Sequence, residues 1–151
     1  MKTTKHLFML LAFVPTTLAI FSSFKAGSQK EPWREDQLME PAALAKIMEN
    51  PEGQQAIVYS VGPGGLIKNS TEVGPAKEKE NLARFKNDLS RLPKDAPIVI
   101  YCGCCPFDRC PNIRPAFKLL NKMKFKNARL LNLRHNLKAD WIDQHYPVKE
   151  E

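Results

Sequence analysis

The stretch "PIVIYCGCCPFDRCPNIRPAF", residues 97–117, decides the fold and contains all four cysteines of the chain. Its first five residues, 97–101, form an uninterrupted apolar run, which predicts a strand buried on both faces. The segment 114–125 places its apolar residues at helical spacing and predicts a helix. The cysteines are therefore expected on a loop between the end of a strand and the start of a helix.

Predicted strands and helices alternate on both sides of this stretch. The other expected helices cover residues 40–50, 78–92 and 137–144, and the other expected strands cover residues 56–61 and 128–133. Residues 66–76 are expected to form a loop with little regular structure. This alternation predicts a three-layer α/β domain, with a mainly parallel central sheet flanked by helices and room for one further short strand.

The N-terminal residues 1–26 have the pattern of a secretory signal. Lys2, Lys5 and His6 precede a run of fourteen residues without a charge, "LFMLLAFVPTTLAI". This basic-then-apolar order predicts export to the periplasm or the medium, with cleavage after Ala19 or Ala26. An uncleaved membrane anchor is the alternative. Residues 27–36 are then a flexible lead-in in which Trp33 docks on the body, and residues 37–151 form the domain.

The charge of the chain disfavours nucleic acid as a partner. Removal of residues 1–26 takes away three lysines and no acidic residue, so the net charge falls from +7 to +4. No arginine-rich run with interleaved aromatic residues is present in the sequence. A mildly basic surface of this kind is usually just solvated, and contact with a membrane is expected only if the N-terminal segment is retained.

The cysteine loop admits several kinds of chemistry. A structural disulfide is disfavoured, because closing such a short loop constrains the unfolded chain little. Zinc is disfavoured, because all four sulfurs lie on one loop while His135 and His145, expected at the surface, are far away in sequence. Soft thiolates would still suit Cu(I). Cys102 and Cys105 also form a C-x-x-C pair, but the 46 residues after Cys105 are too few for a thioredoxin-like fold.

A single reactive thiolate is the remaining alternative. Cys102 is the first residue after the buried strand, and ligands of parallel α/β sheets bind at this carboxyl edge. The N–H groups of a loop that enters a helix stabilise a negative sulfur. Arg109 and Arg114 add positive charge, which lowers a thiol pKa and attracts an anionic substrate. This arrangement suits sulfur transfer from a small anion.

These residues resemble the rhodanese-like family over positions 37–149. "PIVIYC" resembles the family strand that ends in the active cysteine, and "RPAFKLLNKMKFKNARLLNL" resembles the following helix, turn and strand, with Lys124 at a usual glycine. "DWIDQHYPV" resembles the closing W-x-x-x-G-Y-P-V, with His145 at its glycine. The departures are the absent Asp-x-Arg strand end, replaced by Ser60 to Pro63, a longer active-site loop with three extra cysteines, and "RHN" in place of Gly-Gly.

The resemblance implies a sulfurtransferase that needs no cofactor and no metal. Cys102 would carry sulfane sulfur from a thiosulfate-like anion to a thiol or cyanide-like acceptor, with Gly103, Arg109 and Arg114 binding the substrate. The other thiols, Cys104, Cys105 and Cys110, would be auxiliary or resolving residues. A Cys102–Cys105 disulfide is the expected resting form, with Cys110 as the second choice of partner and Cys104 turned away. The alternative is that Cys104, Cys105 and Cys110 merely pack the loop. The alternatives are a non-catalytic module that binds Cu(I) or another soft metal, and a dithiol oxidoreductase that uses Cys102 and Cys105.

Overall fold

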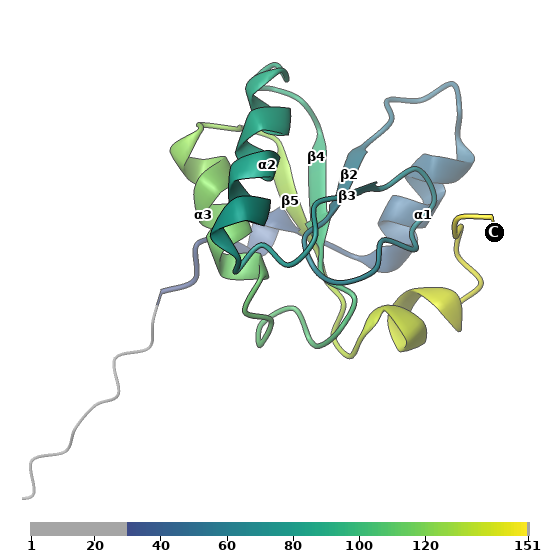
Figure 1. Ribbon diagram of the computed structural model, residues 1–151. Coiled ribbons are helices and arrows are strands. Elements are labelled where there is room, and N and C mark those ends of the chain that lie inside the picture. The colour runs from purple at the N-terminus through teal and green to yellow at the C-terminus, as the bar shows by residue number, and fades with distance from the viewer. Residues whose placement is uncertain (1–29, 151) are drawn as a thin grey trace, which may run out of the picture.

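A five-stranded parallel sheet forms the middle layer of the domain (Figure 1), and the computed structural model describes residues 30–150. The strand order is β1-β5-β4-β2-β3, and each neighbouring pair is parallel. The strands are β1 (Leu38–Met39), β2 (Ile57–Ser60), β3 (Thr71–Glu72), β4 (Ile98–Tyr101) and β5 (Ala128–Leu131). The central position of β4 confirms the strand that was expected to be buried on both faces.

Helices cover both faces of the sheet and complete the predicted three layers. Figure 1 shows α2 and α3 on one face and α1 on the other. The helices are α1 (Pro41–Glu49), α2 (Lys79–Ser90) and α3 (Ile113–Lys122), with short helical turns at η1 (Glu35–Gln37) and η2 (Lys138–Ile142). None of the helices within residues 30–150 combines the length and apolar character needed to span a membrane.

The alternation of side chains along β4 directs Cys102 to one face of the sheet. Ile98 and Ile100 belong to the apolar core under α2 and α3, whereas Val99 and Tyr101 belong to the core on the α1 side. Successive side chains of a strand point to opposite faces. Cys102 therefore falls on the α2 and α3 side, where it is 2% exposed.

The structure differs from the sequence-based expectation at the short elements. The segment 66–76, expected as a loop, contains β3, which pairs in parallel with β2 through Tyr59 and Thr71. The helix expected from Arg114 begins one residue earlier, at Ile113. Pro115 lies within the first turn of this helix, where a backbone N–H would have no acceptor within the helix, so proline costs no hydrogen bond there.

The segment before the sheet lies against the domain. The expected docking of Trp33 is confirmed, because its ring centroid lies 6.1 Å from that of Phe107 and 5.9 Å from that of Phe117. Arg114 stacks over the same indole and pairs with Glu31. The flexible lead-in expected for residues 27–36 is thus packed against the domain from residue 30 onward. The proposed signal or anchor at residues 1–26 lies outside the described residues.

Candidate functional site

The cysteine loop, residues 102–112, is held at the carboxyl edge of the sheet by backbone hydrogen bonds. The Phe107 N–H donates to the Leu133 carbonyl just after β5 (3.0 Å), and the Leu137 N–H donates to the Gly103 carbonyl (3.0 Å). A Cβ atom on Gly103 would lie 3.0 Å from the Leu137 side chain. Gly103, expected to bind substrate, therefore anchors the loop through a close approach that a larger residue would disturb.

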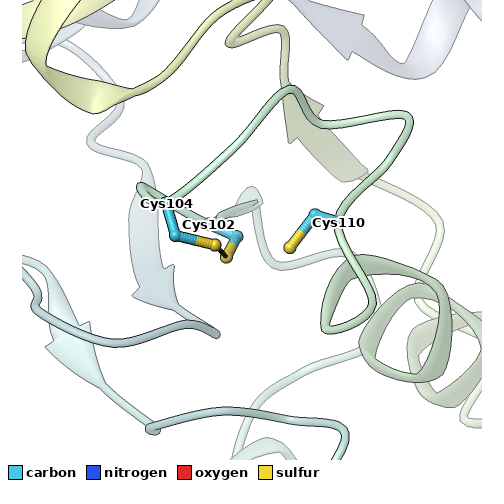
Figure 2. A group of neighbouring side chains, drawn as sticks. All are labelled: Cys102, Cys104 and Cys110. Carbon is cyan, nitrogen blue, oxygen red and sulfur yellow. Dashed lines mark hydrogen bonds between the residues drawn. The ribbon is translucent and has the colours of Figure 1, made fainter.

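Three thiols of this loop form a sulfur cluster, defined as Cys102, Cys104 and Cys110. Their sulfur atoms all lie within 4.8 Å of one another, and the Cys102 and Cys104 sulfurs are 3.4 Å apart. Figure 2 shows Cys104 pointing to Cys102, with Cys110 facing them from the far side of the loop. Cys102 and Cys110 are buried, Cys104 is exposed, and all four cysteines are free.

The neighbours of Cys102 differ from those expected. We predicted that Cys104 would turn away and that Cys105 would face Cys102, and this arrangement is wrong for Cys104. The expectation assumed an extended loop, but residues 103–105 form a bend, so strand-like alternation does not apply. Cys105 contacts the Cys104 sulfur at 3.0 Å and stands outside the sulfur cluster.

Gly62 covers the Cys102 sulfur and was not identified from the sequence. It follows β2 at the point where the Val61 N–H donates to the Tyr101 carbonyl (2.9 Å), which keeps this segment beside the end of β4. A Cβ atom on Gly62 would overlap the Cys102 sulfur. The run "GPGG" signalled only the end of a strand, yet its first glycine provides the space in which the sulfur lies.

Asn112 is the second residue that the sequence analysis missed. It is 3% exposed, and its side-chain Nδ2 donates to the Cys102 sulfur at 3.6 Å. Its Oδ1 accepts the Lys77 N–H at 3.1 Å, which ties the segment before α2 to the site. An asparagine before a helix usually indicates a capping residue, but this side chain makes no cap hydrogen bond to α3.

These donors make Cys102 the most acidic thiol of the cluster. The Cys110 thiol donates to its sulfur, the Cys104 N–H and the Asn112 amide add further donors, and together they outweigh burial and lower the pKa of Cys102 to about 5. The Cys104 residue is exposed, but neighbouring atoms partly desolvate its thiol, and this desolvation, followed by contacts with Cys105 and Cys102, raises its pKa to about 12. The hydrogen bond to Cys102 and burial likewise raise the pKa of Cys110. At neutral pH the cluster therefore holds one thiolate and two thiols.

The two arginines of the loop have different surroundings. Arg114 pairs with Glu31 and donates to the Asp108 carbonyl (2.6 Å), so its guanidinium ties the loop to the lead-in. Arg109 has an exposed side chain, and its backbone N–H donates to Pro106. The surface positions predicted for His135 and His145 are confirmed, because both are exposed.

The largest cavity described lies at the opposite end of the sheet. It has a volume of about 580 Å³ and is lined by residues such as Pro97 and Ile98, at the amino end of β4. Its lining residues include no cysteine and no histidine. The sulfur cluster, with its perturbed pKa values, is the better candidate for chemistry.

A scan against protein-family models finds no match to this chain, and a search of the curated proteins finds no relative. The functional argument therefore rests on the residues and geometry of this molecule.

The alkylation rate of Cys102 should follow a thiolate with a low pKa. We expect the rate constant for alkylation of Cys102 by iodoacetamide to fall as the pH is lowered, with a midpoint near pH 5. The rate is followed by mass spectrometry of the Cys102 peptide and corrected for the reagent's own pH dependence. Cys110→Ala removes the main donor and should move the midpoint upward. Cys105→Ala is the matched control and should leave it unchanged. A wild-type midpoint near the ordinary thiol value, about 8.5, would contradict the assignment.

Proposed function

We propose that this protein is a rhodanese-like sulfurtransferase that carries sulfane sulfur as a persulfide on Cys102. The observation that carries the proposal is the buried Cys102 sulfur at the carboxyl edge of a parallel sheet, beside the Cys104 and Cys110 sulfurs and the Asn112 amide. These neighbours lower its pKa to about 5 and favour the thiolate. A thiolate is the nucleophilic form of cysteine, and parallel α/β sheets bind ligands at this edge. Thiosulfate or a similar small anion is the donor class, and a thiol or cyanide-like molecule is the acceptor class.

The transfer begins with attack by the Cys102 thiolate on the outer sulfur of thiosulfate. A sulfur–sulfur bond forms to Cys102, the bond inside thiosulfate breaks, and sulfite leaves with the bonding electron pair. The acceptor then attacks the outer sulfur of the persulfide and regenerates the thiolate. The Cys102 side chain is buried and the Cys104 side chain beside it is exposed, so the donor approaches Cys102 from the side of Cys104.

The backbone at two positions supports the family resemblance. Lys124 and His145 stand where the family usually has glycine, and both adopt positive φ angles, 62° and 58°. Glycine is the residue best suited to this left-handed region, because the Cβ atom of any other residue makes the conformation sterically unfavourable. At both positions the chain therefore has a backbone conformation that suits glycine, as the resemblance leads us to expect.

Cys102→Ser tests the proposal most directly. With thiosulfate and cyanide as substrates, we expect thiocyanate formation to fall to the rate without enzyme, because serine has no thiolate to attack the donor. Wild-type protein treated with thiosulfate alone should release about one sulfite per chain, and Cys102→Ser should release none. Cys105→Ser, outside the sulfur cluster, is the control and should keep its activity. Equal activity in wild type and Cys102→Ser would overturn the proposal.

The two loop arginines should differ in their effects. Arg109→Ala removes an exposed positive charge near the site and should raise the KM for thiosulfate about two- to fivefold, with the free energy of unfolding unchanged. Arg114→Ala breaks the contacts with Glu31 and Trp33 and should lower the free energy of unfolding by about 1 kcal/mol. Steady-state kinetics and urea unfolding measure the two quantities. Wild-type KM in Arg109→Ala would rule out capture of the anion by this residue.

Binding of a single Cu(I) ion is a second candidate function, favoured by the sulfur cluster. Three thiols whose sulfur atoms lie within 4.8 Å of one another can surround one ion from one side of the loop. Cu(I) prefers soft thiolate ligands. In this case the domain would be a carrier of metal and not an enzyme.

Competition with a Cu(I) chelator under anaerobic conditions separates the two functions. If the metal is the cargo, wild-type protein binds one equivalent, and Cys104→Ala or Cys110→Ala weakens binding at least about tenfold, whereas Cys105→Ala does not. Equal affinities in all four proteins would exclude the cluster as the binding site.

A further inference from the structure

We infer that the persulfide on Cys102 is discharged within the protein by Cys104, which releases hydrosulfide and leaves a Cys102–Cys104 disulfide for a dithiol reductant to reopen. The inference rests on the proposed sulfurtransferase function and adds its product and its redox partner. It also changes the expected partner of Cys102, from Cys105 in a resting disulfide to Cys104 during turnover.

The contacts between the sulfurs favour Cys104 as the resolving thiol. The Cys104 sulfur lies 3.4 Å from that of Cys102, so a small side-chain movement brings the two within bonding distance. Cys105 is in contact with Cys104 at 3.0 Å and lies outside the sulfur cluster. The three thiols of the cluster differ in exposure: Cys110 is fully buried, Cys102 is 2% exposed, and Cys104 is exposed.

Cys110 is close enough to react but suits a different task. Its thiol is the main donor to the Cys102 sulfur, and its side chain is 0% exposed. A disulfide between two buried cysteines would be out of reach of an external reductant. A disulfide that ends at exposed Cys104 offers the reductant an accessible sulfur.

The internal step balances without a further reactant. The Cys104 sulfur attacks the Cys102 sulfur, a bond forms between them, and the bond from Cys102 to its outer sulfur breaks. The outer sulfur leaves with the electron pair of that bond, takes up the proton that Cys104 loses, and departs as hydrosulfide. The outer sulfur is thereby reduced, and the two cysteines are oxidised to a disulfide.

Return to the thiol state requires a dithiol reductant. One of its thiolates attacks the Cys104 sulfur and expels Cys102, and its second thiol then displaces Cys104 and closes a disulfide on the reductant. A thiol of low pKa leaves fastest in such an exchange, and Cys102 has the lowered pKa. Attack at the exposed sulfur therefore expels the better leaving group.

The charge in the cluster determines that Cys102 attacks the donor before Cys104 attacks the persulfide. While Cys102 is a free thiolate, its hydrogen bond and its charge help to keep the pKa of Cys104 high, after the larger effect of desolvation. Cys104 is therefore a protonated bystander during attack on the donor. Attack on thiosulfate moves the negative charge from the Cys102 sulfur to the outer sulfur, so the sulfur that Cys104 then attacks no longer carries that charge.

A single-turnover experiment on the full chain tests this relay. Reduced protein is freed of reductant, treated anaerobically with excess thiosulfate, and analysed for sulfide and by mass spectrometry. Wild type should release about one sulfide per chain, as the balanced step requires, and gain a Cys102–Cys104 disulfide. Cys104→Ser should keep the added sulfur on Cys102 and release sulfide only after dithiothreitol is added. Cys105→Ser is the matched control and should behave as wild type.

The outcomes separate the relay from the function on which it rests. A persulfide in Cys104→Ser with sulfide release equal to wild type would overturn the relay and leave the sulfurtransferase proposal standing. A wild-type disulfide that joins Cys102 to Cys110 or Cys105 would also overturn the relay. If no variant with Cys102 intact ever gains sulfur or releases sulfide, the sulfurtransferase proposal fails and the relay fails with it.

Discussion

Burial of β4 on both faces is the constraint on which the rest of the structure depends. The strand lies between β2 and β5, and its four side chains are divided between the two apolar cores. Because the side chains of β4 alternate between the two faces of the sheet, they determine the face on which Cys102 lies. Because Cys102 is the next residue, the same packing that stabilises the sheet also fixes the position of this cysteine.

Surrounding groups give similar thiols different properties. Cys102 receives hydrogen bonds from Cys110, Asn112 and the loop backbone, which stabilise its negative charge despite burial. Cys104 lacks that set of donors, and its pKa moves in the opposite direction. Position relative to a few donors therefore gives the thiols of one loop opposite pKa shifts. A cluster of three such thiols can carry out more reaction steps than a single cysteine.

The sequence predicted the layers of the fold well, because long apolar runs carry their own signal. The buried run 97–101 and the helical spacing of 78–92 correspond to β4 and α2. β3, with two exposed residues, has no pattern to detect and forms because β2 offers a free edge. At the site, the position of Cys102 followed from the end of the strand. Gly62 and Asn112 did not, because their roles depend on contacts between segments distant in the chain.

The packing of Trp33 gives the protein an optical reporter of its own cysteine loop. The chain has two tryptophans, and they lie on opposite faces of the sheet. Trp33 touches Phe107 within the cysteine loop, whereas Trp141 is fully buried against the α1 side. A rearrangement of the loop changes the surroundings of the first indole and leaves those of the second unchanged. With Trp141 replaced by phenylalanine, the remaining fluorescence would follow the state of the sulfurs in real time, without an added label.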